Sequence, residues 1–211
     1  MKTDMLIGAL AQDSLTGWDF GRTVRLAIAL GILVAGIIFF AGVGFRPDLA
    51  NATETIRFLF KFAITIPLAG AAAAALGRAG RPGSPFGLPG WALAVLPVVL
   101  GCAVLVELIV LPESLWTSRL VGSNAWLCLT LIPLLAMGPL ACFMLALRRG
   151  APTRPGVAGA LAGLAASGIA ATFYATNCTD DSPLFVATWY SIATSMVVAI
   201  GYLAGRRLLK W

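Results

Sequence analysis

Few side chains in this sequence could do chemistry, because it contains four cysteines and nine carboxylates but no histidine. The absence of histidine removes the commonest general base, metal ligand and haem ligand. The sequence also lacks a P-loop glycine motif, a nucleophile elbow and a Cys-x-x-Cys pair. The absence of histidine and of these three motifs excludes most enzyme classes. We therefore expect a protein that is not an enzyme and has no resident cofactor.

Two cysteines lie where they could act together. Cys178 belongs to the polar stretch TNCTDDSP. Cys128 lies about one helical turn after the start of the apolar stretch 124–147, at the same predicted end of the molecule. In an oxidising compartment such a pair can form a disulfide or bind a soft metal ion, and Asp180 and Asp181 would be accessory oxygen ligands. The sequence leaves both chemistries open, because the fold sets the distance between the thiols.

The other candidate groups lie inside apolar stretches. Cys102 and Cys142 are expected to be small buried hydrophobic side chains. Lys61 and Glu107 each lie near the outer end of a stretch, whereas ion carriers place charges near the membrane midplane. We expect Lys61 and Glu107 to stabilise packing and reach the membrane interface, and an ion pair between them is the alternative.

The elements that must position these groups are membrane helices. Hydrophobic residues make up 59% of the 211 residues and charged residues only 11%, and a helix crosses the hydrocarbon layer with roughly 20 apolar residues. Six stretches meet this requirement: residues 23–45, 57–77, 91–111, 124–147, 155–174 and 184–205. The predicted fold is an all-α integral membrane protein with a bundle of six transmembrane helices, residues 23–211.

Basic residues predict the orientation of this bundle, since cytoplasmic connections are enriched in Lys and Arg. They gather before the first stretch, after the second, between the fourth and fifth, and at the C-terminus (Lys2, Arg22, Arg25, Arg78, Arg81, Arg148, Arg149, Arg154, Arg206, Arg207 and Lys210). Both termini are therefore expected in the cytoplasm. The net charge of +6 is dispersed over helix ends, so we expect no direct binding of nucleic acid.

Two further patterns concern helices. Residues 1–22 form a cytoplasmic segment whose start, MKTDMLIGALAQD, has a plausible helix cap at Thr3 and apolar residues among polar ones. We expect a short amphipathic helix that becomes ordered on a protein partner. The alternatives are a helix on the membrane surface and a frayed terminus packed on the bundle. Glycines four residues apart in the fifth and sixth stretches, Gly159 with Gly163 and Gly201 with Gly205, predict close helix packing within the chain.

Several motifs together resemble one family. They are the opening MKTDMLIGALAQD, GFRPDLA after the first stretch, RRGAPTRPG between the fourth and fifth, CTDDSPLFVATWY at the start of the sixth, and the closing GRRLLKW. Their order and spacing resemble the NrsF family of six-pass membrane proteins of the bacterial inner membrane. The resemblance covers the full length of the chain.

This resemblance implies an anti-sigma factor. Its partners would be membrane lipid and a sigma factor of the extracytoplasmic-function type, held by the N-terminal segment through Thr3, Met5, Leu6, Ile7 and Leu10. It also implies that Cys128 and Cys178 take part in sensing periplasmic metal or oxidative stress, with at most transient heavy-metal binding. Family members often carry His just before the loop cysteine, where this chain has Asn177. The oligomeric state is left open.

Two other classes are weighed against this interpretation. A small transporter or channel would share the fold type but would be expected to carry charges at the midplane. A membrane thiol oxidoreductase could use the outer cysteines, but the sequence lacks the usual Cys-x-x-Cys motif.

Overall fold

The computed structural model describes residues 3, 5, 7, 19–81 and 83–209. In this part of the chain every regular element is a helix, and six helices are long and apolar enough to cross a membrane. The long helices are α2 (Phe20–Gly42), α4 (Ile56–Ala79), α5 (Gly87–Val110), α7 (Ala125–Leu147), α8 (Pro155–Ala175) and α10 (Ser191–Leu208). The predicted six-helix bundle is confirmed. Each predicted boundary lies within four residues of the observed one, where the sixth predicted stretch is compared with the continuous helical span Pro183–Leu208 that contains α10.

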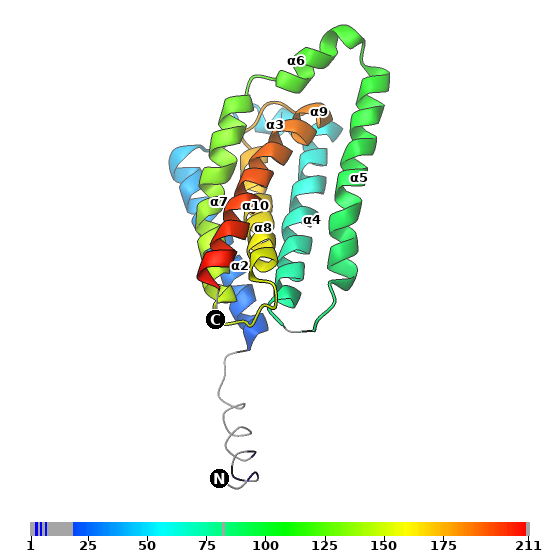
Figure 1. Cartoon of the computed structure of the whole chain (residues 1–211). Coiled ribbons are helices and arrows are strands. Elements are labelled where there is room, and N and C mark those ends of the chain that lie inside the picture. Colours follow the sequence, from blue (N-terminus) through cyan, green and yellow to red (C-terminus); the bar gives the residue numbers. More distant parts are fainter. Residues whose placement is uncertain (1–2, 4, 6, 8–18, 82, 210–211) are drawn as a thin grey trace.

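Short elements cap the end of the bundle opposite to the start of α2 (Figure 1). They are α3 (Leu49–Ala52), the 3-10 turn η1 (Glu113–Leu115), α6 (Trp116–Val121), α9 (Pro183–Phe185) and the π-helical turn η2 (Val186–Tyr190), which continues into α10. The start of α2 and the ends of α4 and α10 lie together at the other end, where the basic connections are (Figure 1). The basic residues predict that this second end faces the cytoplasm, and that orientation stays a prediction.

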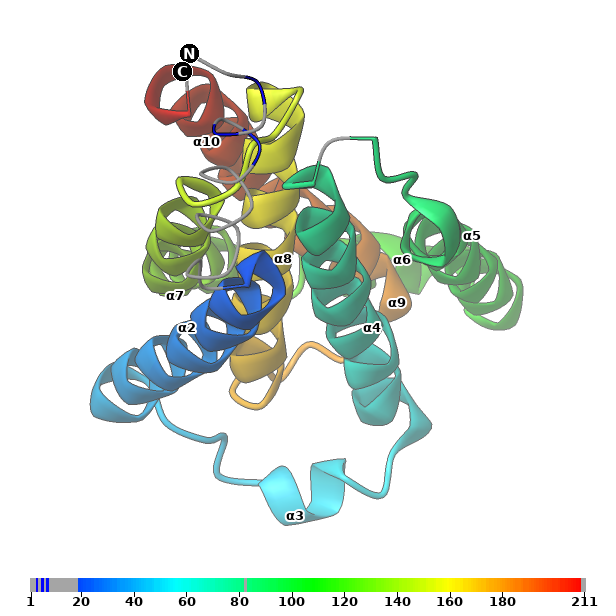
Figure 2. The same cartoon turned by 90° about the horizontal axis from the view of Figure 1, so that it is seen from below.

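Helix α8 is the centre of the bundle, with α2, α4, α7 and α10 packed around it (Figure 2). Its sequence, PGVAGALAGLAASGIAATFYA, is rich in glycine and alanine, which lets neighbouring backbones approach closely. Helix α5 is different, because it packs mainly on α4 and makes only small contacts with α9 and η2. Most of its surface is therefore left for lipid.

The closest approach is between α8 and α10. A Cβ atom added to Gly159 would overlap the backbone carbonyl of Gly201, and one added to Gly163 would lie 2.6 Å from the carbonyl oxygen of Val197. The glycines at a spacing of four therefore pack within the chain, as the sequence predicts.

The N-terminal segment is described only in part. Thr3, Met5 and Ile7 are helical and exposed. Leu6 and Leu10, the other two residues of the predicted sigma-binding set, lie outside the described residues. The amphipathic helix and its role stay predictions.

Candidate functional site

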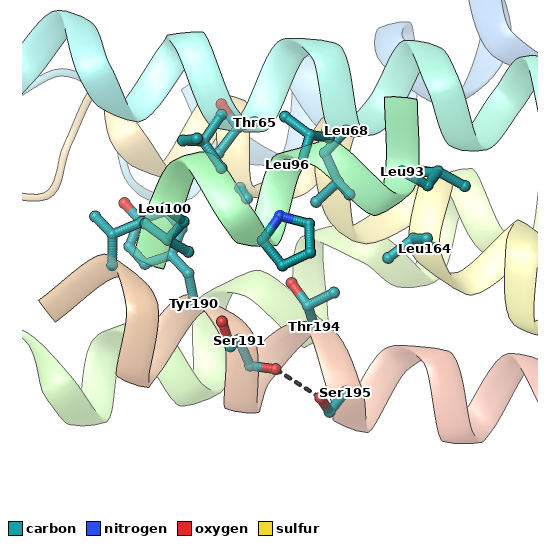
Figure 3. Close-up of a pocket in the computed structure, with 14 residues that line it drawn as sticks. Thr65, Leu68, Leu93, Leu96, Leu100, Leu164, Tyr190, Ser191, Thr194 and Ser195 are labelled. Carbon is teal, nitrogen blue, oxygen red and sulfur yellow. Dashed lines mark hydrogen bonds between the residues drawn. The ribbon is translucent and has the colours of Figure 1, made fainter. Parts of the chain in front are cut away.

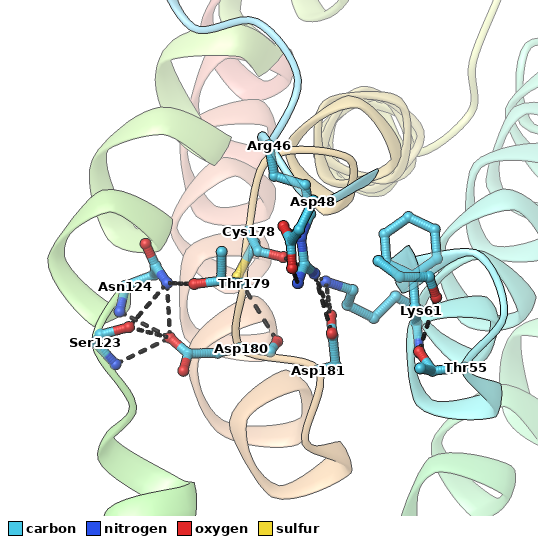
Figure 4. A network of polar contacts seen from close by, with 12 residues as sticks. Arg46, Asp48, Thr55, Lys61, Ser123, Asn124, Cys178, Thr179, Asp180 and Asp181 are labelled. Atoms are coloured by element: carbon cyan, nitrogen blue, oxygen red, sulfur yellow. Dashed lines mark hydrogen bonds and ion pairs between the residues drawn. The ribbon is translucent and has the colours of Figure 1, made fainter. Parts of the chain in front are cut away.

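The connection between α8 and α9, residues 176–182, is the hub of the capped end of the bundle (Figure 4). Its side chains and carbonyls contact the α2–α4 connection, α4, α5 and the α6–α7 connection. We call these residues the hub loop. Four parts of the chain that are distant in sequence are thus tied to one short segment.

The backbone carbonyl of Cys178 is the first tie. It accepts a hydrogen bond of 2.8 Å from the Lys61 ammonium and one of 3.2 Å from the Arg46 guanidinium. The Lys61 side chain has no exposed surface and Arg46 is 8% exposed, so both cations are buried beside the hub loop. Buried cations require partners, and the carbonyl supplies one of them.

Asp181 is the second tie and bears the opposite charge. Its carboxylate lies 2.5 Å from the Lys61 ammonium and 3.0 Å from the Arg46 guanidinium. Arg46 also makes two bonds, of 2.6 and 2.7 Å, to the carboxylate of Asp48. These bonds to Asp48 raise the pKa of Arg46 and lower that of Asp48 below its usual value. A chain of alternating charges therefore joins the α2–α4 connection, the hub loop and α4.

Asp180 is the third tie and points toward α7. It accepts hydrogen bonds from the backbone amides of Ser123 and Asn124, at 2.9 and 2.8 Å, and from the Asn124 side chain at 2.9 Å. The Asn124 carbonyl in turn accepts a 3.2 Å bond from the Tyr174 hydroxyl of α8. The start of α7 is therefore bound both to the last turn of α8, through Tyr174, and to the hub loop, through Asp180.

Glu107 of α5 forms the fourth tie. Its carboxylate accepts bonds of 2.7 Å from the Ser182 hydroxyl and 2.9 Å from the Leu184 amide, and lies 3.8 Å from the Arg57 guanidinium. The expectation that Lys61 and Glu107 reach the membrane interface is wrong, since both are buried in protein. The alternative that they pair with each other is also wrong, because Lys61 pairs with Asp181.

The structure brings the predicted cysteine pair into one buried region. Cys128 and Cys178 have no exposed surface and belong to the same core cluster, and both thiols are free. The Cys178 thiol donates a long bond of 3.7 Å to the Asp180 carbonyl. Burial raises the pKa of the Cys178 thiol. The protonated thiol is a poor nucleophile and metal ligand. Because Cys178 has no exposed surface, a reagent would reach its thiol only if the surrounding residues moved.

The other two cysteines are not part of this region. Cys142 is half-buried and packs on the core, whereas Cys102 is exposed on α5. The prediction of a buried Cys102 is therefore wrong. The reason is that α5 turns only a small part of its surface to the protein.

The two accessory carboxylates do not face the cysteines as free ligands. Asp180 is occupied by the amides at the start of α7, and Asp181 by Lys61 and Arg46. Among the described residues no three His, Cys, Asp or Glu side chains are grouped so as to hold a metal ion. A soft metal at this site would thus depend on the two thiolates alone until the hub loop rearranges.

Next to the cysteine region lies an apolar groove between α4, α5 and α10, with a volume of about 200 Å³ (Figure 3). Tyr190 of η2 forms part of its lining and belongs to the same core cluster as Cys178. The lining residues are aliphatic, aromatic or hydroxyl-bearing, and none is charged. This groove therefore offers no support for an ion pathway at the midplane.

Comparison with known proteins identifies the family. Residues 10–211 match the family described as NrsF, negative regulator of sigma F. The chain belongs to the NrsF family. The anti-sigma-F factor NrsF of Caulobacter vibrioides is 36% identical over the whole of both chains, and the probable anti-sigma-F factor NrsF of Azospira oryzae is 31% identical over the same extent. No solved structure matches the chain.

The NrsF assignment confirms the resemblance seen in the sequence motifs, and two of these five motifs contain residues of the polar network around the hub loop. GFRPDLA contains Arg46 and Asp48, and CTDDSPLFVATWY contains Cys178, Asp180 and Asp181. Sequence patterns did not indicate that Arg46 is a buried bridge, that Ser123 and Asn124 bind the hub loop, or that Tyr174 binds Asn124. The presence of Arg46 within a family motif was the available signal.

Proposed function

We propose that this NrsF-family chain is a membrane-bound anti-sigma factor that sequesters an extracytoplasmic-function sigma factor through residues 1–22. The main support for this proposal is that the whole chain matches two proteins named as anti-sigma-F factors, one of them as a probable one. Sequestration at the bacterial inner membrane keeps the sigma factor from RNA polymerase. The basic residues at the end of the bundle where α2 begins support a cytoplasmic position for this segment.

The proposed signal acts on Cys128 and Cys178 at the periplasmic end. Oxidation or metal binding must favour a state in which the thiols are accessible, because both are buried in this one. Moving Cys178 would disturb its carbonyl bonds to Lys61 and Arg46, which belong to α4 and to the connection after α2. Helix α2 begins at Phe20, within the proposed sigma-binding residues 1–22, so its displacement would link the two sites.

Removal of residues 1–20 is expected to abolish sigma-factor binding. The intact chain and the truncated chain would be purified from their host in mild detergent, and the bound proteins identified by mass spectrometry. The truncated chain must retain its helical circular dichroism signal as a control for folding. A sigma factor recovered equally with both chains would contradict the role of the segment, and no sigma factor with either would contradict sequestration.

Cys128→Ser and Cys178→Ser are each expected to reduce induction of a sigma-dependent reporter by metal or oxidant. The reason is that serine keeps the size of the side chain but loses its redox chemistry and soft-metal affinity. Cys142→Ser is the matched control, because Cys142 lies outside the pair. Normal induction in both test variants would exclude cysteine sensing and leave sequestration standing.

A further inference from the structure

A second groove, distinct from the hub, lies between α2 and α4 near the end of the bundle where α2 begins. It has a volume of about 570 Å³, is lined mainly by apolar residues, and has Ile169 of α8 among its lining. Helices α2 and α4 both pack on α8 but touch each other only slightly. An unfilled trough therefore separates them on the side that faces the membrane. We call it the inner groove.

Small residues keep the α4 wall of the inner groove open. Gly70, Ala73, Ala74 and Gly77 follow one another on the same face of α4 and line the trough. A Cβ atom added to Gly70 or Gly77 would meet no atom within 4 Å. These glycines thus differ from Gly159, where any side chain would collide with the backbone of α10.

The length of the inner groove matches one leaflet of a bilayer. Along α4 its lining extends from Arg78 to Ile66, about 18 Å, and along α2 from Gly21 to Ile32, about 16 Å, at 1.5 Å per residue. Half of the hydrocarbon layer is about 15 Å thick. The groove is therefore long enough for an acyl chain and too short to seat a second membrane-crossing helix along its full length.

Three arginines line the groove at its basic end: Arg25, Arg78 and Arg81. Arg78 donates bonds of 2.6 Å to the carbonyl of Phe86 and 3.4 Å to that of Pro85. Arg81 lies 3.4 Å from the carboxylate of Asp19, and both side chains of that pair are largely exposed. Each guanidinium has five N–H donors, so these contacts leave donors for a ligand. No acidic residue is among the lining residues.

We propose that the inner groove binds an anionic phospholipid, with one acyl chain in the trough and the phosphate on Arg25, Arg78 and Arg81. The positive charge at headgroup level and the apolar trough of one-leaflet length match the two parts of such a lipid. The phosphate would compete with Asp19 for Arg81, immediately before α2 begins. The proposed lipid site goes beyond the proposed function, and its test requires no sigma factor.

The test is lipid binding to the full chain in mild detergent, measured by native mass spectrometry. Phosphatidylglycerol and phosphatidylcholine with identical acyl chains are titrated separately. Phosphatidylglycerol is expected to bind more tightly, and Arg25→Gln or Arg81→Gln to weaken its binding about fivefold each. Gly70→Leu fills the trough and is expected to weaken binding of both lipids.

Matched controls separate these effects from altered folding or general charge. Arg207→Gln removes an arginine of α10 that does not line the groove, and Gly101→Leu adds the same side chain at an open position of α5. Both controls should bind phosphatidylglycerol as the unchanged protein does. Equal binding of the two lipids, equal losses in test and control variants, or complete displacement of the lipid by soluble glycerol phosphate would overturn the proposal.

Discussion

Asp181→Asn is expected to destabilise the protein by about 3–5 kcal/mol, the usual cost of removing one partner from a buried ion pair. Asp181 is shared by Lys61, which has no exposed surface, and Arg46, which is nearly buried. Asparagine has nearly the same shape but no charge. The substitution would leave two buried cations side by side, with Asp48 as the remaining carboxylate bound to Arg46.

The measurement is the unfolding of the detergent-solubilised chain, followed by its helical circular dichroism signal. Asp48→Asn is the matched control, because Asp48 is half exposed and its partner Arg46 keeps Asp181. It should have a smaller effect, because the Asp48 carboxylate is partly solvated and Arg46 keeps a second carboxylate. If Asp181→Asn lowered the unfolding free energy no more than Asp48→Asn, the ion pairs of Asp181 with Lys61 and Arg46 would not stabilise this end of the bundle.

The second large effect is expected for Gly159→Ala. The added Cβ atom would overlap the backbone of Gly201, which cannot rotate away as a side chain can. Helices α8 and α10 must therefore move apart along their contact. We expect a loss of about 2–3 kcal/mol or more, at the upper end of the usual cost of overpacking.

Gly101→Ala provides the comparison for Gly159→Ala. Gly101 lies within α5, where an added Cβ atom would have no neighbour within 4 Å. Both substitutions gain the same helix propensity, up to about 1 kcal/mol, so the difference between them reports the helix contact alone. Unfolding midpoints measured in the same detergent would decide the matter. Equal midpoints would mean that the two helices do not approach at Gly159.

The two expectations concern different aspects of the same bundle. The glycine contact fixes α10 against the central helix, and α10 continues from η2 and α9, which follow the hub loop. The hub in turn ties α4, α5 and the start of α7 to that loop. A movement of Cys178 and the hub loop would therefore alter contacts with α4, α5 and the start of α7 at once.

The sequence by itself determined the class of fold and the positions of the helices. A membrane-crossing backbone must satisfy its own hydrogen bonds, so a run of about 20 apolar residues can be recognised as a helix without knowledge of its neighbours. The glycine spacing in α8 and α10 likewise predicted their contact, since it depends on local residue size. The proximity of Cys128 and Cys178 could be suspected from their common depth at one end of the bundle.

Only the tertiary structure decided how the polar side chains are paired. Lys61 meets Asp181, 120 residues away, and Glu107 meets Ser182, because the order of helices around α8 brings these positions together. Hydropathy carries no information on that order. Helix α5 shows the same limit for burial: it is apolar all round, so no stripe indicates which side faces lipid and which faces protein, and Cys102 lies exposed. Local patterns thus fix elements, whereas partners depend on packing between elements distant in sequence.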